Sequence, residues 1–189
     1  MTSDYFDTYL SEVKDICDLL DRESINSFTN ILKNTTGRCF VIGLGGSAAN
    51  ATHLVNDLRK LCGIESYSPL DNVSELTARI NDDSWESSIK DCLAVSNINQ
   101  HDCLLVLSVG GGSNITSQPL VQSMRFAKEQ GCKVISIVSR DGGEAKTLSD
   151  SYILIPMIHE NRITPHAEEF QGVLWHMIVN SITDGEIND

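Results

Sequence analysis

Two hydrophobic spacings alternate along this chain. Short apolar runs bounded by glycine, serine or proline predict buried strands, and longer segments with apolar residues every three or four positions predict amphipathic helices. The predicted strands lie at 38–43, at 64–68, within 101–114, at 133–140 and at 151–156. The predicted helices lie at about 4–33, 47–62, 71–82, 83–98 and 118–131, within 141–150, and at about 166–183.

This alternation of strands and helices predicts the fold class. Successive strands joined by helices form parallel sheets whose two faces are covered by those helices. We therefore expect an α/β protein, a three-layer αβα sandwich around a five-stranded parallel sheet. No repeat, low-complexity segment or linker interrupts the pattern, so residues 1–189 are expected to form a single domain.

Capping residues suggest where several helices begin and end. Asn72 or Ser74 is expected to cap the helix at 71–82, and Ser84 is expected to begin the next helix. Gly63 is expected to end the helix that starts near residue 47.

The overall charge narrows the range of partners. The chain has a net charge of −12, with 41% hydrophobic and 6% aromatic residues, which suits an α/β domain and argues against nucleic acid as a ligand. An anionic small molecule is still compatible with this charge, because a local nest of backbone N–H groups can bind phosphate.

The pattern also argues against a membrane protein. No apolar run approaches the roughly 20 residues that a spanning helix needs, and the acidic N-terminus lacks the apolar segment of a signal peptide. The six cysteines include no C-x-x-C pair, which favours reduced thiols. We therefore expect a cytoplasmic protein with no membrane contact.

Glycine-rich elbows follow two of the predicted strands. Residues 43–48 fit the dinucleotide pattern G-x-G-x-x-A, but LSVGGGSN follows a second strand and SRDGG a third. Loops at the carboxyl ends of neighbouring parallel strands line one crevice, where their N–H groups and the hydroxyls of Ser47, Ser108 and Ser113 favour one phosphate monoester over a dinucleotide. Alternatively, the glycines only close tight strand–helix turns.

Three segments carry a resemblance to a known family. GLGGSAANATHLVNDL, LSVGGGSN and SRDGG, in this order and spacing, resemble the SIS (sugar isomerase) domain, and within it the phosphoheptose isomerase group. The resemblance implies the SIS fold and the conversion of sedoheptulose 7-phosphate to a heptose 7-phosphate for lipopolysaccharide or capsule synthesis. It also implies a set of substrate-binding residues: Gly45, Gly46, Ser47, Asp82, Ser108, Gly110, Gly111, Gly112, Ser113 and Glu168.

Aldose–ketose isomerisation needs an acid–base pair and a group that stabilises an enediolate. His53 and Asp57 are four residues apart and share a face of the predicted helix, and Glu168 or Glu169 could share a face with His176. The resemblance aligns Asp57 with the family's catalytic glutamate and His176 with its catalytic histidine. It further implies a zinc site formed by His53, Asp57, Glu168 and His176, with Glu168 in the place of a glutamine.

The sequence departs from the family pattern at three places. Leu44 replaces a polar residue of the first elbow, and the second elbow has glycines where the family has more hydroxyl side chains. Asp57 is one methylene shorter than glutamate, and a displacement of about 1 Å at a reacting group can cost on the order of 100-fold in rate.

Two other functions remain open at this point. A non-catalytic SIS module could sense a sugar phosphate or bind a partner protein, and a dinucleotide-dependent oxidoreductase would have only Glu65 as its ribose-binding acid. Long helices at both ends of the chain favour a homodimer or homotetramer. The family resemblance implies sites between the subunits. We expect Trp175 in the core or an interface, and His166 as a cap or surface residue or within the site.

Overall fold

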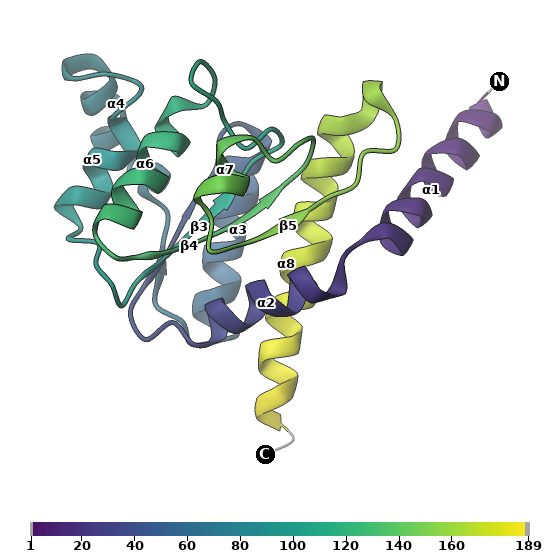
Figure 1. The fold of residues 1–189 in the computed structure, drawn as a ribbon, viewed down its shortest axis with the longest axis horizontal. Coiled ribbons are helices and arrows are strands. Elements are labelled where there is room, and N and C mark those ends of the chain that lie inside the picture. The colour runs from purple at the N-terminus through teal and green to yellow at the C-terminus, as the bar shows by residue number, and fades with distance from the viewer. Residues whose placement is uncertain (1, 188–189) are drawn as a thin grey trace.

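The computed structural model describes residues 2–187 and contains one five-stranded parallel sheet (Figure 1). The strands lie in the order β2-β1-β3-β4-β5, with β1 (Cys39–Ile42) and β3 (Cys103–Leu107) next to one another. The other strands are β2 (Ser66–Tyr67), β4 (Lys133–Val138) and β5 (Ser151–Leu154). The expected parallel sheet is confirmed.

Eight helices surround the sheet within the described residues. They are α1 (Thr2–Leu19), α2 (Arg22–Lys33), α3 (Gly46–Lys60), α4 (Val73–Asp82), α5 (Ser88–Val95), α6 (Gln118–Glu129), α7 (Gly143–Leu148) and α8 (Ile163–Ile187). Two short 3₁₀ turns, Pro69–Asp71 and Glu160–Arg162, precede α4 and α8.

The two faces of the sheet form separate hydrophobic cores because side chains alternate along each strand. From β1, Cys39 and Val41 enter the core formed with α2, α3 and α8, and Phe40 and Ile42 enter the core formed with α5, α6 and α7. The chain is therefore the expected three-layer sandwich, and α3 and α8 lie on the same face.

The expected single N-terminal helix at 4–33 is wrong, because the structure has two helices there. The break lies at Leu20 and Asp21, where the Asp21 carboxylate accepts hydrogen bonds from Glu23 N at 3.0 Å and Ser24 Oγ at 2.5 Å and so caps α2. Helix α1, which precedes the break, extends away from the body of the molecule (Figure 1).

Other helix boundaries differ by a few residues from those expected. Asn72 rather than Ser74 caps α4, because its side chain accepts a hydrogen bond from Glu75 N. The next helix begins at Ser88 and not at Ser84, whose hydroxyl instead accepts a hydrogen bond from Ser87 N in the preceding turn. Helix α8 starts at Ile163, earlier than expected.

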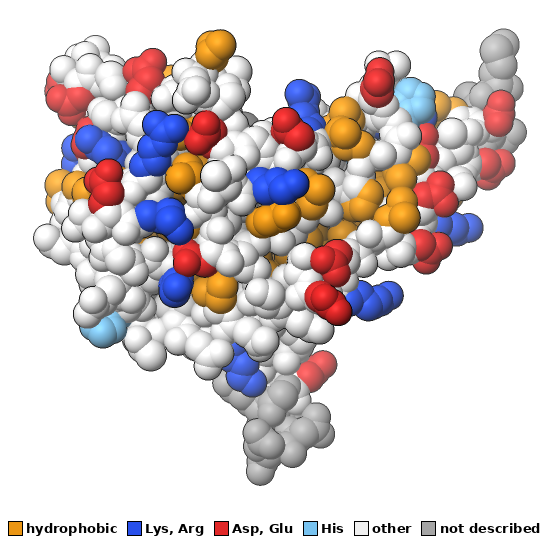
Figure 2. Space-filling view, in the orientation of Figure 1, with side chains coloured by type: hydrophobic (Ala, Val, Ile, Leu, Met, Phe, Trp, Pro, Cys, Tyr) orange, Lys and Arg blue, Asp and Glu red, His pale blue; other side chains and the backbone are white. Residues whose placement is uncertain are grey.

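Helix α1 exposes a set of large apolar side chains. Tyr5, Phe6, Leu10 and Leu19 are each more than half exposed, and acidic side chains lie along the same helix (Figure 2). No described helix combines the length and the apolar character needed to cross a membrane.

Candidate active site

The first glycine elbow joins β1 to α3. Gly45 has φ +63 and precedes the first residue of α3, a conformation that favours glycine. At Gly43, an added Cβ would lie 2.4 Å from the carbonyl oxygen of Ser47, so the backbone approaches itself too closely for a side chain. The elbow thereby turns the chain so that the N–H groups of the first turn of α3 face the carboxyl end of the sheet.

The second elbow follows β3, which is the direct neighbour of β1, so the two elbows lie at the same edge of the sheet. Gly111 and Gly112 have φ of +69 and +80, and a Cβ on Gly111 would lie 1.9 Å from the carbonyl oxygen of Gly142. The carbonyl oxygens of these two glycines accept hydrogen bonds from Ala145 N and Glu144 N. The second elbow therefore packs against the turn at 139–143, and close packing by itself accounts for these glycines.

The hydroxyls of the second elbow make local hydrogen bonds. Ser108 Oγ accepts a hydrogen bond from Gly111 N at 3.1 Å. Ser113 Oγ accepts hydrogen bonds from Ile115 N and Thr116 N, both at 3.1 Å. Much of the acceptor capacity of Ser113 is therefore used within its own turn.

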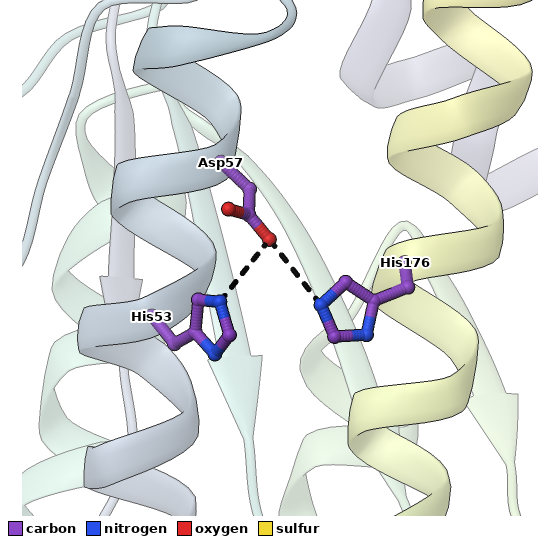
Figure 3. Close-up of side chains that lie close together, drawn as sticks. All are labelled: His53, Asp57 and His176. Carbon is purple, nitrogen blue, oxygen red and sulfur yellow. Dashed lines mark ion pairs between the residues drawn. The ribbon is translucent and has the colours of Figure 1, made fainter.

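Two histidines and an aspartate from two helices meet at one point (Figure 3). Asp57 Oδ2 lies 3.6 Å from His53 Nε2, on the same face of α3, and 3.5 Å from His176 Nε2 on α8. One donor atom from each residue lies within 4.8 Å of the others. The structure thus brings together three of the four residues expected to bind metal.

Asp57 is buried, whereas both imidazoles are half exposed. Trp175 Nε1 donates a hydrogen bond to Asp57 Oδ2 at 3.3 Å, and Asn56 Nδ2 donates one to Oδ1 at 3.0 Å. The Trp175 ring also contacts the edge of His53, with centroids 5.3 Å apart. Trp175 is buried as expected, but its contact with Asp57 was not anticipated; the only hint in the sequence is its position next to His176.

The fourth expected metal ligand, Glu168, lies elsewhere. It is eight residues before His176, about 12 Å along α8. A Cβ added to Gly46 would lie 2.5 Å from the carboxylate carbon of Glu168, so this carboxylate sits against the first elbow. Glu169 does not join His176 either, since it accepts a hydrogen bond from Tyr9 Oη at 2.5 Å.

Asp82 lies apart from the cluster around Asp57. It is the exposed last residue of α4, a helix that packs against α5 and the 3₁₀ turn before it, and it accepts a hydrogen bond from Asn81 Nδ2 at 2.7 Å. Within residues 2–187, no hydrogen bond or ion pair connects Asp82 to either elbow, so its expected role in substrate binding remains a prediction.

His166 belongs to a buried ion-pair network, and the expected surface or capping position is wrong. Its Nε2 lies 2.9 Å from Glu12 Oε2, and its Nδ1 lies 3.2 Å from Glu169 Oε2. Arg162 donates to both oxygens of Glu12, and this hydrogen bonding lowers the pKa of the Glu12 carboxyl from 4.5 to about 2. The network ties α1 to the beginning of α8.

Comparisons with known proteins show the family to which the sequence is similar. A family model described as SIS domain matches residues 8–139. The phosphoheptose isomerase of Syntrophotalea carbinolica is 28% identical to this chain, over 94% of this chain and 91% of the relative. The phosphoheptose isomerase of Helicobacter pylori strain Shi470 is 30% identical, over 84% of this chain and 80% of the relative.

The fold is also shared with a solved structure. The phosphoheptose isomerase from Neisseria gonorrhoeae superposes with a TM-score of 0.81 at 21% identity, over 97% of this chain and 100% of that one. At this identity the likeness shows the common fold.

Proposed function

The chain belongs to the SIS-domain family, and on this premise we propose that it is a ketose–aldose isomerase that converts sedoheptulose 7-phosphate to a heptose 7-phosphate. The observation that supports this proposal most directly is the meeting of Asp57 with two imidazoles along the helix that begins at the first glycine elbow. A module that only binds a sugar phosphate needs the elbow but has no need of this cluster.

In the proposed reaction Asp57 and His176 move the protons. The Asp57 carboxylate removes a proton from C1 of the ketose and returns it to C2. His176 transfers a proton between the oxygens on these carbons, so the carbonyl moves from C2 to C1 without a hydride cofactor. Hydrogen bonds from Trp175 and Asn56 hold the carboxylate in place for this transfer.

The proposed phosphate site is the first elbow. Ser47 and His53 are six residues apart on α3, about 9 Å along the helix axis. Five C–C bonds and a phosphate ester separate C2 from phosphorus in the substrate, which is also on the order of 9 Å in an extended chain with bonds of about 1.5 Å. A seven-carbon sugar phosphate is therefore long enough for its phosphate to lie at the elbow while its carbonyl end reaches His53.

The same cluster is suited to a zinc ion. Two imidazole nitrogens and one carboxylate oxygen are a donor set that zinc uses in catalytic sites, where three protein ligands leave one position open. We propose His53, Asp57 and His176 as the ligands through the atoms that face one another, which leaves Asp57 Oδ1 and His176 Nδ1 for proton transfer. Glu168 is left out because its carboxylate lies at the elbow. When bound there, zinc would polarise the substrate carbonyl and stabilise negative charge on the enediolate.

A second copy of the chain is proposed to complete the site. The side chains of His53 and His176 are 54% and 52% exposed, and the apolar side chains of Val173 and Met177 are exposed on α8 next to His176. Helix α1 also exposes large apolar side chains. A homodimer or homotetramer would bury both, and would shield the reacting groups from water.

Incubation with sedoheptulose 7-phosphate, with and without added zinc, tests the function. We expect NMR to detect the aldose product, and we expect no product from unphosphorylated sedoheptulose under the same conditions. Tight binding of the sugar phosphate with no product under either metal condition would contradict the isomerase and favour a sugar-phosphate sensor.

A further inference from the structure

A series of hydrogen bonds through two side-chain amides, the half-buried Asn50 and the buried Gln171, connects α8 to the first elbow. Asn50 Nδ2 donates to the backbone carbonyl of Glu168 and to Gln171 Oε1, both at 2.9 Å. Gln171 Nε2 in turn donates to Ser47 Oγ at 3.0 Å. Gln171 is fully buried and Ser47 is 2% exposed, so water does not compete for the hydrogen bond between these two residues.

The backbone carbonyl of Glu168 fixes which group donates and which accepts in each of these three hydrogen bonds. A backbone carbonyl can only accept, so the NH₂ group of Asn50 must face Glu168. The second hydrogen of that NH₂ group then requires the oxygen of Gln171, which turns the NH₂ group of Gln171 toward Ser47. Ser47 Oγ is therefore an acceptor in this contact.

An acceptor role toward Gln171 leaves the hydroxyl proton of Ser47 available. Within the described part of the chain, no protein group accepts this proton. Ser47 lies in the first turn of the 15-residue helix α3, beside the exposed Gly45 and Gly46. A ligand at the elbow would thus meet a hydroxyl that is oriented to donate, and phosphate oxygens are strong acceptors.

We propose that Gln171 is a positioning residue of the phosphate site: it holds the Ser47 hydroxyl as a hydrogen-bond donor toward the substrate phosphate. This inference rests on the function proposed above. The orientation of the Ser47 hydroxyl matters more because the Glu168 carboxylate also lies against the elbow and repels a phosphate there. A Ser47 lone pair turned toward the phosphate would add to this repulsion.

Three variants test the inference. Gln171→Met keeps the length of the side chain but frees the Ser47 hydroxyl to rotate. Gln171→Glu places an acceptor opposite Ser47 and captures its proton. Asn50→Asp removes both donated hydrogen bonds of Asn50, so the Gln171 amide is free to turn its oxygen to Ser47. Gln130→Met, on the exposed C-cap of α6, is the matched control.

The measurements are the Kd for inorganic phosphate, and the KM and kcat for sedoheptulose 7-phosphate. We expect Gln171→Met and Asn50→Asp to raise Kd and KM by about tenfold with kcat within twofold, and Gln171→Glu to raise them by about 100-fold, whereas Gln130→Met should behave as the wild type. In a Ser47→Ala background, Gln171→Met should change Kd by less than twofold, because no hydroxyl remains to be oriented.

The outcomes separate this inference from the proposed function. Phosphate affinity within twofold of wild type in folded Gln171→Met or Asn50→Asp overturns the inference alone, as does an undiminished effect of Gln171→Met in the Ser47→Ala background. Phosphate binding that depends on Gln171, without turnover of sedoheptulose 7-phosphate, supports the inference and contradicts the isomerase. A wild-type protein that does not bind phosphate overturns both. Melting temperatures identify any variant that fails to fold. If either Gln171→Met or Asn50→Asp does not fold, the phosphate affinity of the remaining one of these two variants tests the inference.

Discussion

The indole nitrogen of Trp175 donates a hydrogen bond of 3.3 Å to Asp57 Oδ2, the same oxygen that faces both histidines. This contact joins α8 to α3 through a buried donor and a buried carboxylate. It also limits how far the carboxylate can rotate. The position of the proposed base is therefore set by a residue adjacent to His176 in the sequence.

Replacement of Trp175 by phenylalanine should slow the reaction with little effect on binding. The ring would still fill the core, but Asp57 would lose one donor, so we expect kcat to fall about tenfold with KM unchanged. Steady-state kinetics measure this split. Trp85→Phe, at the other tryptophan, which is 42% exposed, is the control and should match wild type. A normal kcat in Trp175→Phe would show that this hydrogen bond does not position the base.

Asp57→Asn should remove most of the activity while the fold is retained. Asparagine has nearly the same shape, but it cannot accept the substrate proton, so kcat should fall about 10³-fold, within the range typical of a lost general base. The NMR assay measures the rate, and circular dichroism checks the fold. Asp15→Asn, on the exposed side of α1, is the control. Retention of a tenth or more of the wild-type kcat would exclude Asp57 as the base.

Metal content gives a separate test of the cluster. We expect elemental analysis after mild dialysis to find zinc at close to one equivalent per chain, and His53→Ala to reduce it below about a tenth of an equivalent. Glu168→Gln should leave the zinc content unchanged, since Glu168 lies about 12 Å along α8 from His176. Loss of zinc in Glu168→Gln would instead show that Glu168 is a fourth zinc ligand.

Glu168→Gln should strengthen phosphate binding. The carboxylate lies against Gly46, where the substrate phosphate is proposed to bind, and two negative groups at this distance repel one another. A neutral amide removes the repulsion, so we expect KM for sedoheptulose 7-phosphate to fall about tenfold at low salt and less at high salt. Glu169→Gln is the control on the same helix. An unchanged or higher KM would indicate that Glu168 contacts the sugar rather than repelling the phosphate.

The sheet and its order of elements were predictable because the three central strands, β1, β3 and β4, are apolar runs buried on both faces over nearly their whole length. The break between α1 and α2 was not, since the apolar spacing continues through Leu19 and Leu20 and only the cap at Asp21 ends the pattern. Local capping chemistry of this kind is weaker than the periodic signal around it.

The candidate site was predictable only in part. The spacing of His53 and Asp57 places them on one face of α3 whatever the tertiary structure, because residues four apart are neighbours on a helix. The contacts of Trp175 and Gln171 depend on how α8 is rotated against α3, which the sequence of α8 does not determine. The spacing of Glu168 and His176 suggested a shared face, and it also places them about two helical turns apart. The sequence did not reveal that the Glu168 carboxylate lies against Gly46.

The Glu12 network should make the anchoring of α1 depend on pH. Hydrogen bonds from Arg162 lower the pKa of Glu12 from 4.5 to about 2, so the folded state favours the ionised carboxylate. This contribution to stability is fully present above pH 4.5 and is lost as the pH falls from 4.5 to about 2, where the folded state also binds the proton. Glu12→Gln removes it at every pH, and at pH 7 we expect Tm to fall by on the order of 5 °C.

Thermal melts of wild type and Glu12→Gln at pH 7, 4.5, 3 and 2.5 measure this effect. The difference in Tm between the two proteins should stay constant from pH 7 to 4.5 and then shrink as the pH is lowered. Glu23→Gln, on the exposed first turn of α2, should show no such trend. Because His166 also contacts Glu12, the series is repeated with His166→Gln, which should lower Tm but keep the acid dependence set by Arg162. A difference in Tm that persists unchanged at pH 2.5 would mean that Glu12 stabilises α1 through packing rather than through its charge.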